Sequence, residues 1–477
     1  MVSGYIFWFI ISRITTSQVI GSSSAVVSLG TIFSIAAGLG IPSGIQRFLG
    51  KSFSDHNEEE IKILAKASLI LTSIGIAACC ILILIMYNWI YKELRIDFSL
   101  IILTILFVIS TSVMTLFRSI VISSLKTRVL PLVMIISATV KLGLAIVLVL
   151  ISIGALGVTI GFTSFPILAS VLLGIILLKV FRSSGIGNSK ANLRRYSKPI
   201  LAASVAAWIP SLIHTIGTYL GPLLVYGSNG ASQAGIYFIA FSLVTAISAV
   251  MSALFTIGYP TLSTMEDGRK RFSWRAVKMT LIISLPLSSA FIAYSKQVMQ
   301  LFGHEYVSGS YSLEILLLSM LPIAVTTAIY TLVYSYGNYT QVLAIGLASS
   351  IPRTLLYFVL VPFYDITGAS ISYTLGSLMG FLASAIIARK INMQIFWKDL
   401  ALTLAIPSAI AFFLSYFQTN YILGISITLI ASYLIFLKTK IITRMDVQDS
   451  LAIVPENIAH PLHRMTNSIY KKLNKMR

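Results

Sequence analysis

Two basic residues, Lys141 and Arg353, stand inside apolar segments that carry no Asp or Glu near them. A charged side chain at mid-membrane costs at least about 2.5–3.5 kcal/mol on insertion scales, so such residues usually face a cavity or a partner. Arg offers forked donors and Lys a point charge, and both suit a phosphate group. The pair therefore predicts an anion site, unless both cations reach the membrane surface or bind helix-end carbonyls.

The remaining reactive residue types do not form a catalytic pattern. Cys79 and Cys80 are neighbours in an apolar segment, where helix geometry points them about 100° apart, so we interpret them as structural. His460 and His463 are three residues apart, yet no third metal ligand accompanies them. The sequence contains no P-loop, nucleophile elbow or paired intramembrane carboxylates. We expect no enzyme activity, no cofactor and no metal.

The elements that position the two cations are membrane-spanning helices. Apolar residues make up 57% of the chain and charged residues 10%, with a mean hydropathy of +0.90. A bilayer core needs about 20 apolar residues per helix, and continuous runs disfavour a β-barrel. We predict an all-α polytopic membrane protein with fourteen helices, at residues 2–12, 22–45, 64–86, 99–121, 130–151, 157–181, 199–222, 233–258, 277–295, 311–333, 341–362, 367–388, 398–416 and 420–437.

The first of these segments is short. Even twelve residues would rise only about 18 Å, so its start lies upstream of Met1 or the helix is incomplete. A signal peptide is a poor interpretation, because no basic region precedes the apolar stretch and no clean cleavage site follows it.

The distribution of basic residues predicts the orientation. Placing both termini in the cytoplasm puts 29 of the 35 Lys and Arg residues on the inner side. The outer loops then hold only Arg13, Lys92, Arg95 and Lys296. The net charge of +20 is explained by contact with anionic inner-leaflet lipids, so we expect no nucleic-acid partner.

Internal repetition predicts two lobes. The segment from Lys141 to Gly157 resembles the segment from Arg353 to Gly368: a cation, an apolar run, then a small turn ending in Gly. They lie six helices apart, which is typical of transporters with parallel repeats, although two apolar segments also resemble each other by chance.

The predicted boundaries follow from this repeat and from the polar loop at 181–198. We expect an N-terminal lobe at 1–190, a C-terminal lobe at 191–390, two further helices at 391–437 and a basic cytoplasmic tail at 438–477. Beyond Pro461 the tail has an apolar stripe opposite basic residues, which predicts an interfacial amphipathic helix. A solvated basic tail is the alternative.

The seventh helix is a candidate cavity wall. Its segment 208–222 is rich in Pro, Gly and hydroxyl groups, which permit bends and free backbone carbonyls. Thr215, Thr218 and Tyr219 are candidates for hydrogen bonds to sugar, and His214 is a candidate titrating group. Ordinary close packing through small residues, with a satisfied buried histidine, is the alternative.

Four segments resemble the polysaccharide-export flippases (Wzx type) of the multidrug/oligosaccharidyl-lipid/polysaccharide exporter superfamily. They are LGIPSGIQRFLG (39–50), AGIYFIAFSL (234–243), LFGHEYVSGSYSLEILLLSML (301–321) and LVPFYDITGASIS (360–372). Arg13 and Gly21 keep the places that the family's pattern gives them. The family's Gly-Pro is Thr16-Ser17 here, and the acidic residue often found in its seventh helix is absent, which weakens any expectation of acid-based ion coupling.

The resemblance implies a flippase in the plasma membrane. Its substrate would be a polyprenyl-(pyro)phosphate-linked oligosaccharide, moved from the cytoplasmic to the outer leaflet by alternating access. Lys141 and Arg353 would hold the headgroup, while Arg13 and Arg47 would contact it at the two mouths. Glycosyltransferases or a polymerase are candidate partners. The alternatives are a multidrug or cation efflux transporter of the same superfamily and a non-transporting scaffold of a glycan-assembly complex.

Overall fold

The computed structural model describes residues 2–55, 57–124, 127–182, 193–265 and 267–441. All regular elements in these ranges are helices, and ten of them are long and apolar enough to cross a membrane. The predicted all-α polytopic class is therefore confirmed. The predicted amphipathic helix in the tail lies outside the described residues.

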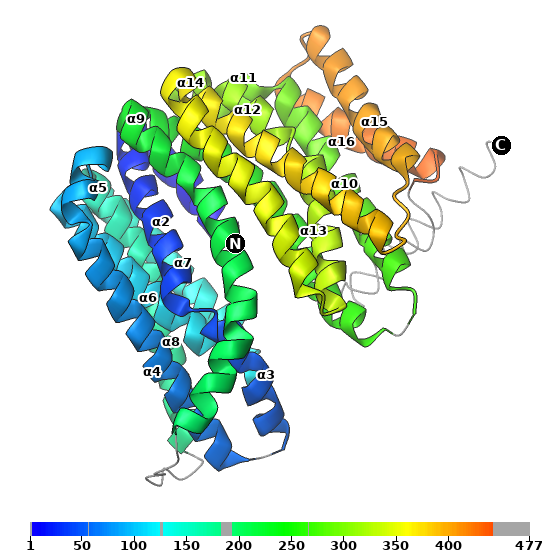
Figure 1. The fold of residues 1–477 in the computed structure, drawn as a ribbon. Coiled ribbons are helices and arrows are strands. Elements are labelled where there is room, and N and C mark those ends of the chain that lie inside the picture. The colour runs from blue at the N-terminus through cyan, green and yellow to red at the C-terminus, as the bar shows by residue number, and fades with distance from the viewer. Residues whose placement is uncertain (1, 56, 125–126, 183–192, 266, 442–477) are drawn as a thin grey trace. The chain divides into compact units, whose positions relative to one another are not determined.

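The first third of the chain is a series of helices with short connections (Figure 1). They are α1 (Val2–Ile14), α2 (Ser17–Gly38), α3 (Ile41–Ser54), α4 (Glu58–Ile85), α5 (Tyr87–Leu94), α6 (Phe98–Ser123), α7 (Val129–Leu150) and α8 (Gly154–Arg182).

The rest of the described chain includes two elements, α9 and α14, that each consist of two helices joined across a break. The elements are α9 (Leu193–Thr264), α10 (Arg269–Ala293), α11 (Ser295–Gln300), η1 (His304–Gly309), α12 (Ser310–Leu317), α13 (Met320–Ser335), α14 (Tyr339–Lys390), α15 (Trp397–Tyr416) and α16 (Tyr421–Lys438).

The two long helices are each interrupted once. Gly230 breaks α9 at φ 85°, and Asp365 breaks α14 at φ 50°. Splitting both raises the ten candidate spans of the described residues to twelve. The pair His304–Leu317 and Met320–Ser335, bent by 42°, adds one, and the shorter apolar stretch Ser3–Ile14 adds another. The result is the predicted fourteen segments.

The second predicted helix, 22–45, is divided in the structure. Helix α2 ends at Gly38, since Leu39 and Gly40 adopt left-handed conformations at φ 49° and 69°. Glycine is required at position 40 also by space, because an added Cβ would lie 2.5 Å from the carbonyl oxygen of Ser204. Pro42 then opens α3, as proline commonly does in a first turn.

The chain forms two compact units. Among the described residues, the first comprises 2–246, 299–316 and 339–380, and the second comprises 247–298, 317–338 and 381–441. These units are defined by contacts within the chain, whereas the boundaries 1–190, 191–390, 391–437 and 438–477 rest on the repeat and stay a prediction.

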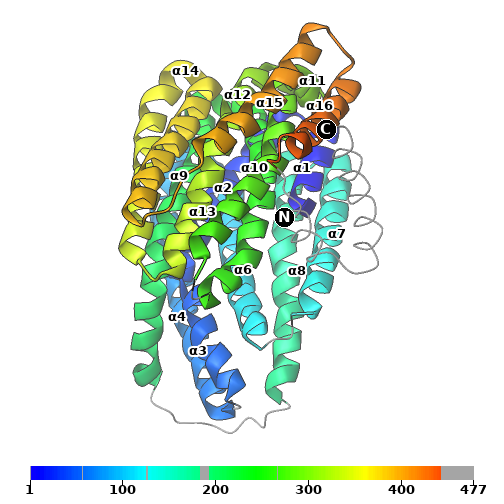
Figure 2. The same cartoon turned by 90° about the vertical axis from the view of Figure 1, so that its right-hand side faces the viewer.

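In the first unit, α2, α4, α6 and α8 pack side by side, and α7 packs between α1 and α8 (Figures 1 and 2). One of its cores joins α3, α4, α6 and α8 through buried aliphatic side chains such as Ile45, Leu64, Leu116 and Leu173. Burying one such side chain contributes about 1.5–3 kcal/mol in water. In a bilayer, van der Waals packing between these side chains stabilises the helix contacts instead.

In the second unit, α10 packs against α13, α15 and α16. Its core includes the fully buried Phe436 with Ile282. The Tyr294 hydroxyl forms a 2.6 Å hydrogen bond with the Thr419 hydroxyl, and the Tyr294 ring lies against Gly424, where no side chain would fit.

Candidate functional site

Arg353 lies in the first half of α14, in the first compact unit. The break at Asp365 turns the chain back, so the second half of α14 runs antiparallel beside the first. Gly376 permits this contact, because a Cβ there would lie 2.4 Å from the Cβ of Arg353. The guanidinium group is consequently buried, with 3% of the residue exposed.

The surroundings of Arg353 satisfy only part of its hydrogen-bonding capacity. Its Nη2 donates to the Ser377 hydroxyl at 2.9 Å, and its guanidinium carbon lies 4.2 Å from the ring centroid of Tyr373. Nε and Nη1 have no hydrogen-bond acceptor among the described residues. Buried polar groups are nearly always paired, so two free donors on one guanidinium mark a candidate anion site.

Two further tyrosines accompany the arginine. Tyr237 and Tyr357 are fully buried, and their hydroxyls converge beside Gly221. An added Cβ on Gly221 would lie 3.1 Å and 2.9 Å from these oxygens. Tyr357 lies one helix turn after Arg353 on α14, on the same face of the helix. The site therefore combines one cation with several phenolic groups, and among the described residues no carboxylate pairs with it.

Lys141 is buried in a different environment, the Lys141 cage. Its Nζ lies 4.9 Å from the ring centroid of Phe7, 5.2 Å from that of Phe162 and 5.3 Å from that of Phe165. Its hydrogen-bond acceptor is the Ser3 carbonyl oxygen at 3.4 Å. Aromatic faces attract an ammonium group, and in a desolvated site the attraction reaches about 2 kcal/mol.

The two cations occupy equivalent places in two helical hairpins. Lys141 on α7 meets aromatic side chains 21 and 24 residues later on α8, at Phe162 and Phe165. Arg353 meets Tyr373 and Ser377 on the return segment of α14, 20 and 24 residues later. Each hairpin also packs through the glycine of the predicted repeat.

Those glycines are Gly157 and Gly368. A Cβ added to either would meet the backbone of the preceding helix, at Leu148 and Leu360 respectively. The local geometry of the two segments is therefore similar, while the relation between whole lobes stays a prediction.

Each cation lies beside its own group of aromatic rings in the first unit. Beside Lys141, Phe7 contacts Trp8 at 5.1 Å between ring centroids, and Trp8 contacts Phe238 at 4.8 Å. Beside Arg353, Tyr373 meets Phe241 at 5.6 Å, and Phe241 stacks on Tyr237 at 6.0 Å. Both groups reach α9, where Tyr237 and Phe238 are neighbours in sequence.

The seventh-helix candidates lie on α9. His214 is exposed, and Tyr219 packs its ring against Phe241. Thr215 and Thr218 are buried, and each hydroxyl donates at 2.8 Å to a carbonyl of its own helix, at Ser211 and His214. Only the acceptor capacity of these two hydroxyls remains for a ligand.

The two remaining candidate cations lie on α1 and α3. The Arg13 side chain is exposed in the last turn of α1 and makes no hydrogen bond within the described chain. Arg47 lies on α3, and its side chain is outside the described part.

Sequence reasoning missed the aromatic partners of the cations. Phe162, Phe165 and Tyr373 lie on the return helices, and nothing in their own segments distinguishes them from core residues. The signal was available as a spacing of 20–24 residues after each cation, but interpreting it requires knowing that both hairpins are tight.

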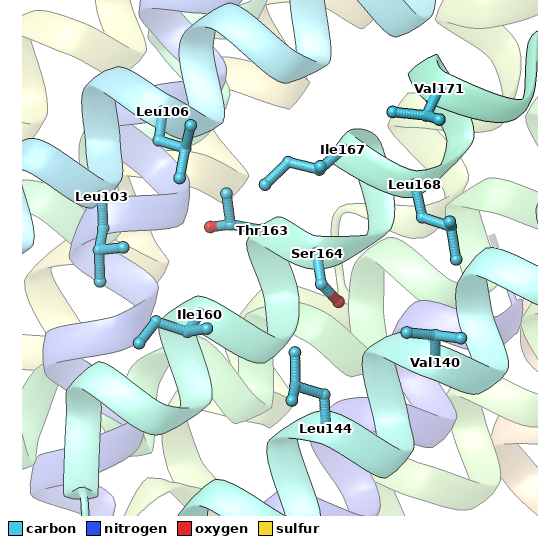
Figure 3. A pocket seen from close by; sticks show the side chains of 10 residues that line it. All are labelled: Leu103, Leu106, Val140, Leu144, Ile160, Thr163, Ser164, Ile167, Leu168 and Val171. Carbon is cyan, nitrogen blue, oxygen red and sulfur yellow. The ribbon is translucent and has the colours of Figure 1, made fainter.

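An apolar groove of about 350 Å³ lies between α6, α7 and α8, beside the segments that hold the Lys141 cage (Figure 3). Its walls are aliphatic, with Thr163 and Ser164 as the polar members. Ser164 donates to the carbonyl of Gly161, so its hydroxyl serves its own helix. Among the described residues no group of His, Cys, Asp or Glu is placed to hold a metal ion.

Several solved structures have a similar fold. The lipid II flippase MurJ in an inward closed conformation superposes with a TM-score of 0.63 at 15% identity, covering 89% of this chain and 98% of that one. An inward-facing multidrug resistance MATE transporter of the MOP superfamily gives 0.60 at 14%, covering 81% and 94%. A MOP superfamily transporter from Pyrococcus furiosus gives 0.55 at 14%, covering 81% and 96%. The fold is that of MOP superfamily transporters.

The amino-acid sequence shows which family the chain belongs to. Residues 1–266 match the family described as polysaccharide biosynthesis protein, and the chain belongs to that family. It is 22% identical over 171 residues to the "Putative O-antigen transporter" of Shigella flexneri, a match that covers 35% of this chain and 41% of that relative. The chain is thus a multi-pass membrane protein of the polysaccharide biosynthesis family.

Proposed function

We propose that this transporter moves a polyprenyl-(pyro)phosphate-linked oligosaccharide from the cytoplasmic to the outer leaflet, for polysaccharide or glycoprotein biosynthesis. The observation that carries the proposal is the buried pair Lys141 and Arg353, neither of which has a carboxylate partner among the described residues. Buried cations without a counter-ion are expensive, and an anionic headgroup supplies the missing charge.

The chemistry of each cation supports a phosphate ligand. Arg353 has Nε and Nη1 available as donors, and two donors from one guanidinium match two phosphate oxygens. Lys141 contributes a point charge that lies among the rings of the Lys141 cage. Its ammonium group donates only a 3.4 Å hydrogen bond to the Ser3 carbonyl, and an ionic bond to phosphate would be more favourable.

The remaining candidates complete the proposed path. His214, Thr215, Thr218 and Tyr219 contact the glycan from α9. Arg13 and Arg47 receive and release the phosphate at the two mouths. The predicted lobes 1–190 and 191–390 alternate between an inward-open and an outward-open state.

The proposed setting is the plasma membrane, with both termini in the cytoplasm. The polyprenyl tail stays in lipid during translocation, and the cytoplasmic loops face anionic headgroups. Glycosyltransferases or a polymerase of the same glycan are the proposed protein partners.

A multidrug or cation efflux activity is the second candidate, because the chain shares its fold with a multidrug resistance MATE transporter. Efflux of cationic drugs requires carboxylates in the central cavity, whereas the deep charges of the described chain are cationic. A non-transporting scaffold of a glycan-assembly complex is the third. The MOP transporter fold favours a carrier over a scaffold.

The deciding experiment is transport by the purified full chain in proteoliposomes. We expect translocation of a fluorescent polyprenyl-pyrophosphate oligosaccharide, no translocation of the same glycan on a neutral polyprenol, and no uptake of a cationic dye. Translocation of the neutral glycolipid at an equal rate would contradict a headgroup-based mechanism. Dye uptake alone would favour efflux, and no transport of any probe would favour the scaffold.

The double variant Lys141→Ala/Arg353→Ala should abolish this transport. Lys296→Ala is the matched control, because Lys296 is an exposed cation outside the membrane spans. Full activity of the double variant at normal protein levels would disprove the assignment of the site and leave the substrate assignment standing.

A further inference from the structure

The N-terminus of α2 is capped by a residue far away in sequence. Thr16 occupies the N-cap position but makes no side-chain capping bond. Instead, Glu305 of η1 accepts a hydrogen bond from the Ser17 backbone N–H at 3.0 Å and another from the Ser17 hydroxyl at 2.6 Å. Ser17 Oγ also lies 2.8 Å from the Ser232 hydroxyl on α9. These three residues form what we call the latch.

The latch lies directly beside a very close helix crossing. A Cβ added to Gly21 on α2 would lie 1.7 Å from the carbonyl oxygen of Ala231, and one added to Gly235 on α9 would lie 1.9 Å from that of Ser17. The backbones of α2 and α9 therefore touch here. No space for a ligand remains between them at this level.

Other turns meet at the same end of the first unit. Asn229, next to the break in α9, donates to a carboxylate oxygen of Asp365, which is the break in α14. Gly227 packs against the backbone of Glu93 at the end of α5. Figure 1 shows α5 at the end of the bundle opposite α3. The distribution of basic residues predicts this end to be the outer one.

The latch joins segments that belong to different predicted lobes. Ser17 belongs to 1–190, while Glu305 and Ser232 belong to 191–390. Alternating access requires these lobes to separate at the outer end when substrate leaves. A carboxylate that accepts two hydrogen bonds at a helix N-terminus makes a strong contact. The contact of Glu305 with Ser17 lies at the outer end, so it must break when the lobes separate there.

We propose that Glu305, through Ser17 and Ser232, is a releasable latch that holds the outer end of this transporter closed. This role rests on the proposed alternating access and adds the element that controls it. Without the latch, only the packing at Gly21 and Gly235 stabilises the closed state. The closed state is then less stable, so the outward-open population rises.

The test is the accessibility of a buried reporter beneath the crossing. Ser28 is fully buried on α2, and it lies on the same helix face as Gly21 because the two are seven residues apart. We would introduce Ser28→Cys with Cys79→Ala and Cys80→Ala, and label oriented membrane vesicles of the full chain with a membrane-impermeant maleimide from the outer side. No substrate is needed, so the result does not depend on transport.

Two variants open the latch by different routes. Glu305→Ala removes the acceptor. Ser17→Pro removes both donors yet suits the first position of α2, because Thr16 is extended at φ −85° and ψ 159° and proline favours a helix start. We expect either variant to raise the labelling rate about tenfold, which corresponds to about 1.4 kcal/mol. The double variant should label no faster than the single ones, since both remove one interaction.

A local cap serves as the matched control. Asn57 caps α4 by accepting from the Glu60 N–H at 3.1 Å, within one helix turn and without joining distant segments. Asn57→Ala should leave Ser28→Cys labelling unchanged. Equal labelling in the parent, Glu305→Ala and Ser17→Pro proteins would overturn the latch, as would an equal increase in Asn57→Ala. Transport of the labelled glycolipid by the parent protein would stand in either case.

Discussion

The guanidinium group of Arg353 lies over the ring of Tyr373, with 4.2 Å between the guanidinium carbon and the ring centroid. The two residues face each other because the break at Asp365 folds α14 into a hairpin, in which Gly376 lets the two halves touch at Arg353. The stacking positions the planar group while Nε and Nη1 stay without acceptors among the described residues. Tyr373 is therefore a positioning residue for the proposed headgroup site.

Removing the Tyr373 ring should weaken transport more than removing its hydroxyl. A buried cation–π contact is worth about 2 kcal/mol, so Tyr373→Ala should lower the rate at low substrate by roughly tenfold to thirtyfold. Tyr373→Phe keeps the ring and should retain most activity. Initial rates in proteoliposomes measure both. Equal losses in the two variants would show that the hydroxyl, and not the stacked face, matters.

Arg353→Lys should be a poor substitute for arginine. Lysine keeps the charge but loses the fork and the planar face that meets Tyr373, so the half-saturating substrate concentration should rise by about tenfold. The change should be smaller for a monophosphate than for a pyrophosphate headgroup, since fewer oxygens are contacted. Equal titration curves for the arginine and lysine proteins would contradict forked recognition.

Lys141→Met should separate folding from transport. Methionine matches the apolar stem, and replacing a buried charge by an apolar group is often neutral or stabilising. Its sulfur also suits the cage of Phe7, Phe162 and Phe165. We expect an unchanged or higher Tm in detergent together with at least about tenfold slower transport. A lower Tm would indicate that Lys141 is structural, and Lys296→Met is the control.

The helices could be predicted because their apolar residues form continuous runs in the sequence. Runs of about 20 apolar residues give the helices without any knowledge of neighbours. The division of the second helix at Leu39 and Gly40 was missed, although Gly40 and Pro42 are local signals for the end of one helix and the start of the next. The contact of Gly40 with α9 is visible only in the structure. The breaks at Gly230 and Asp365 fall in the gaps that the hydropathy pattern leaves between predicted helices, at 223–232 and 363–366.

The candidate site could be predicted only in part. The two deep cations stand out because charge is rare in apolar helices, and the structure places both in buried aromatic surroundings. Which rings meet them depends on how each hairpin closes. The role of Glu305 was invisible in sequence, since its partner Ser17 is 288 positions away.

The predicted orientation has a direct test of its own. With both termini in the cytoplasm, Lys278 lies on the inner side and Lys296 on the outer side. Single cysteines at these positions, in a protein lacking Cys79 and Cys80, should react with an impermeant maleimide from opposite sides of the membrane. The sequon Asn338-Tyr339-Thr340 should stay unglycosylated in a eukaryotic host, because it would face the cytoplasm. Labelling of the Lys278 position from outside would disprove the orientation.

The helix crossing beside the latch predicts a strict requirement for glycine at position 235. An alanine Cβ there would lie 1.9 Å from the Ser17 carbonyl oxygen, and a backbone atom cannot swing aside as a side chain can. Gly235→Ala should therefore push α2 and α9 apart, lowering the free energy of unfolding by about 1–3 kcal/mol.

Gly143→Ala is the matched control for this crossing. Gly143 lies inside α7, where a Cβ would meet nothing within 4 Å, so alanine should stabilise the helix by up to about 1 kcal/mol. Thermal unfolding in detergent compares the two variants, and the Ser28→Cys reporter should label faster in Gly235→Ala alone. If Gly235→Ala unfolds at the parent temperature and its reporter stays protected, the backbones of α2 and α9 do not touch as described.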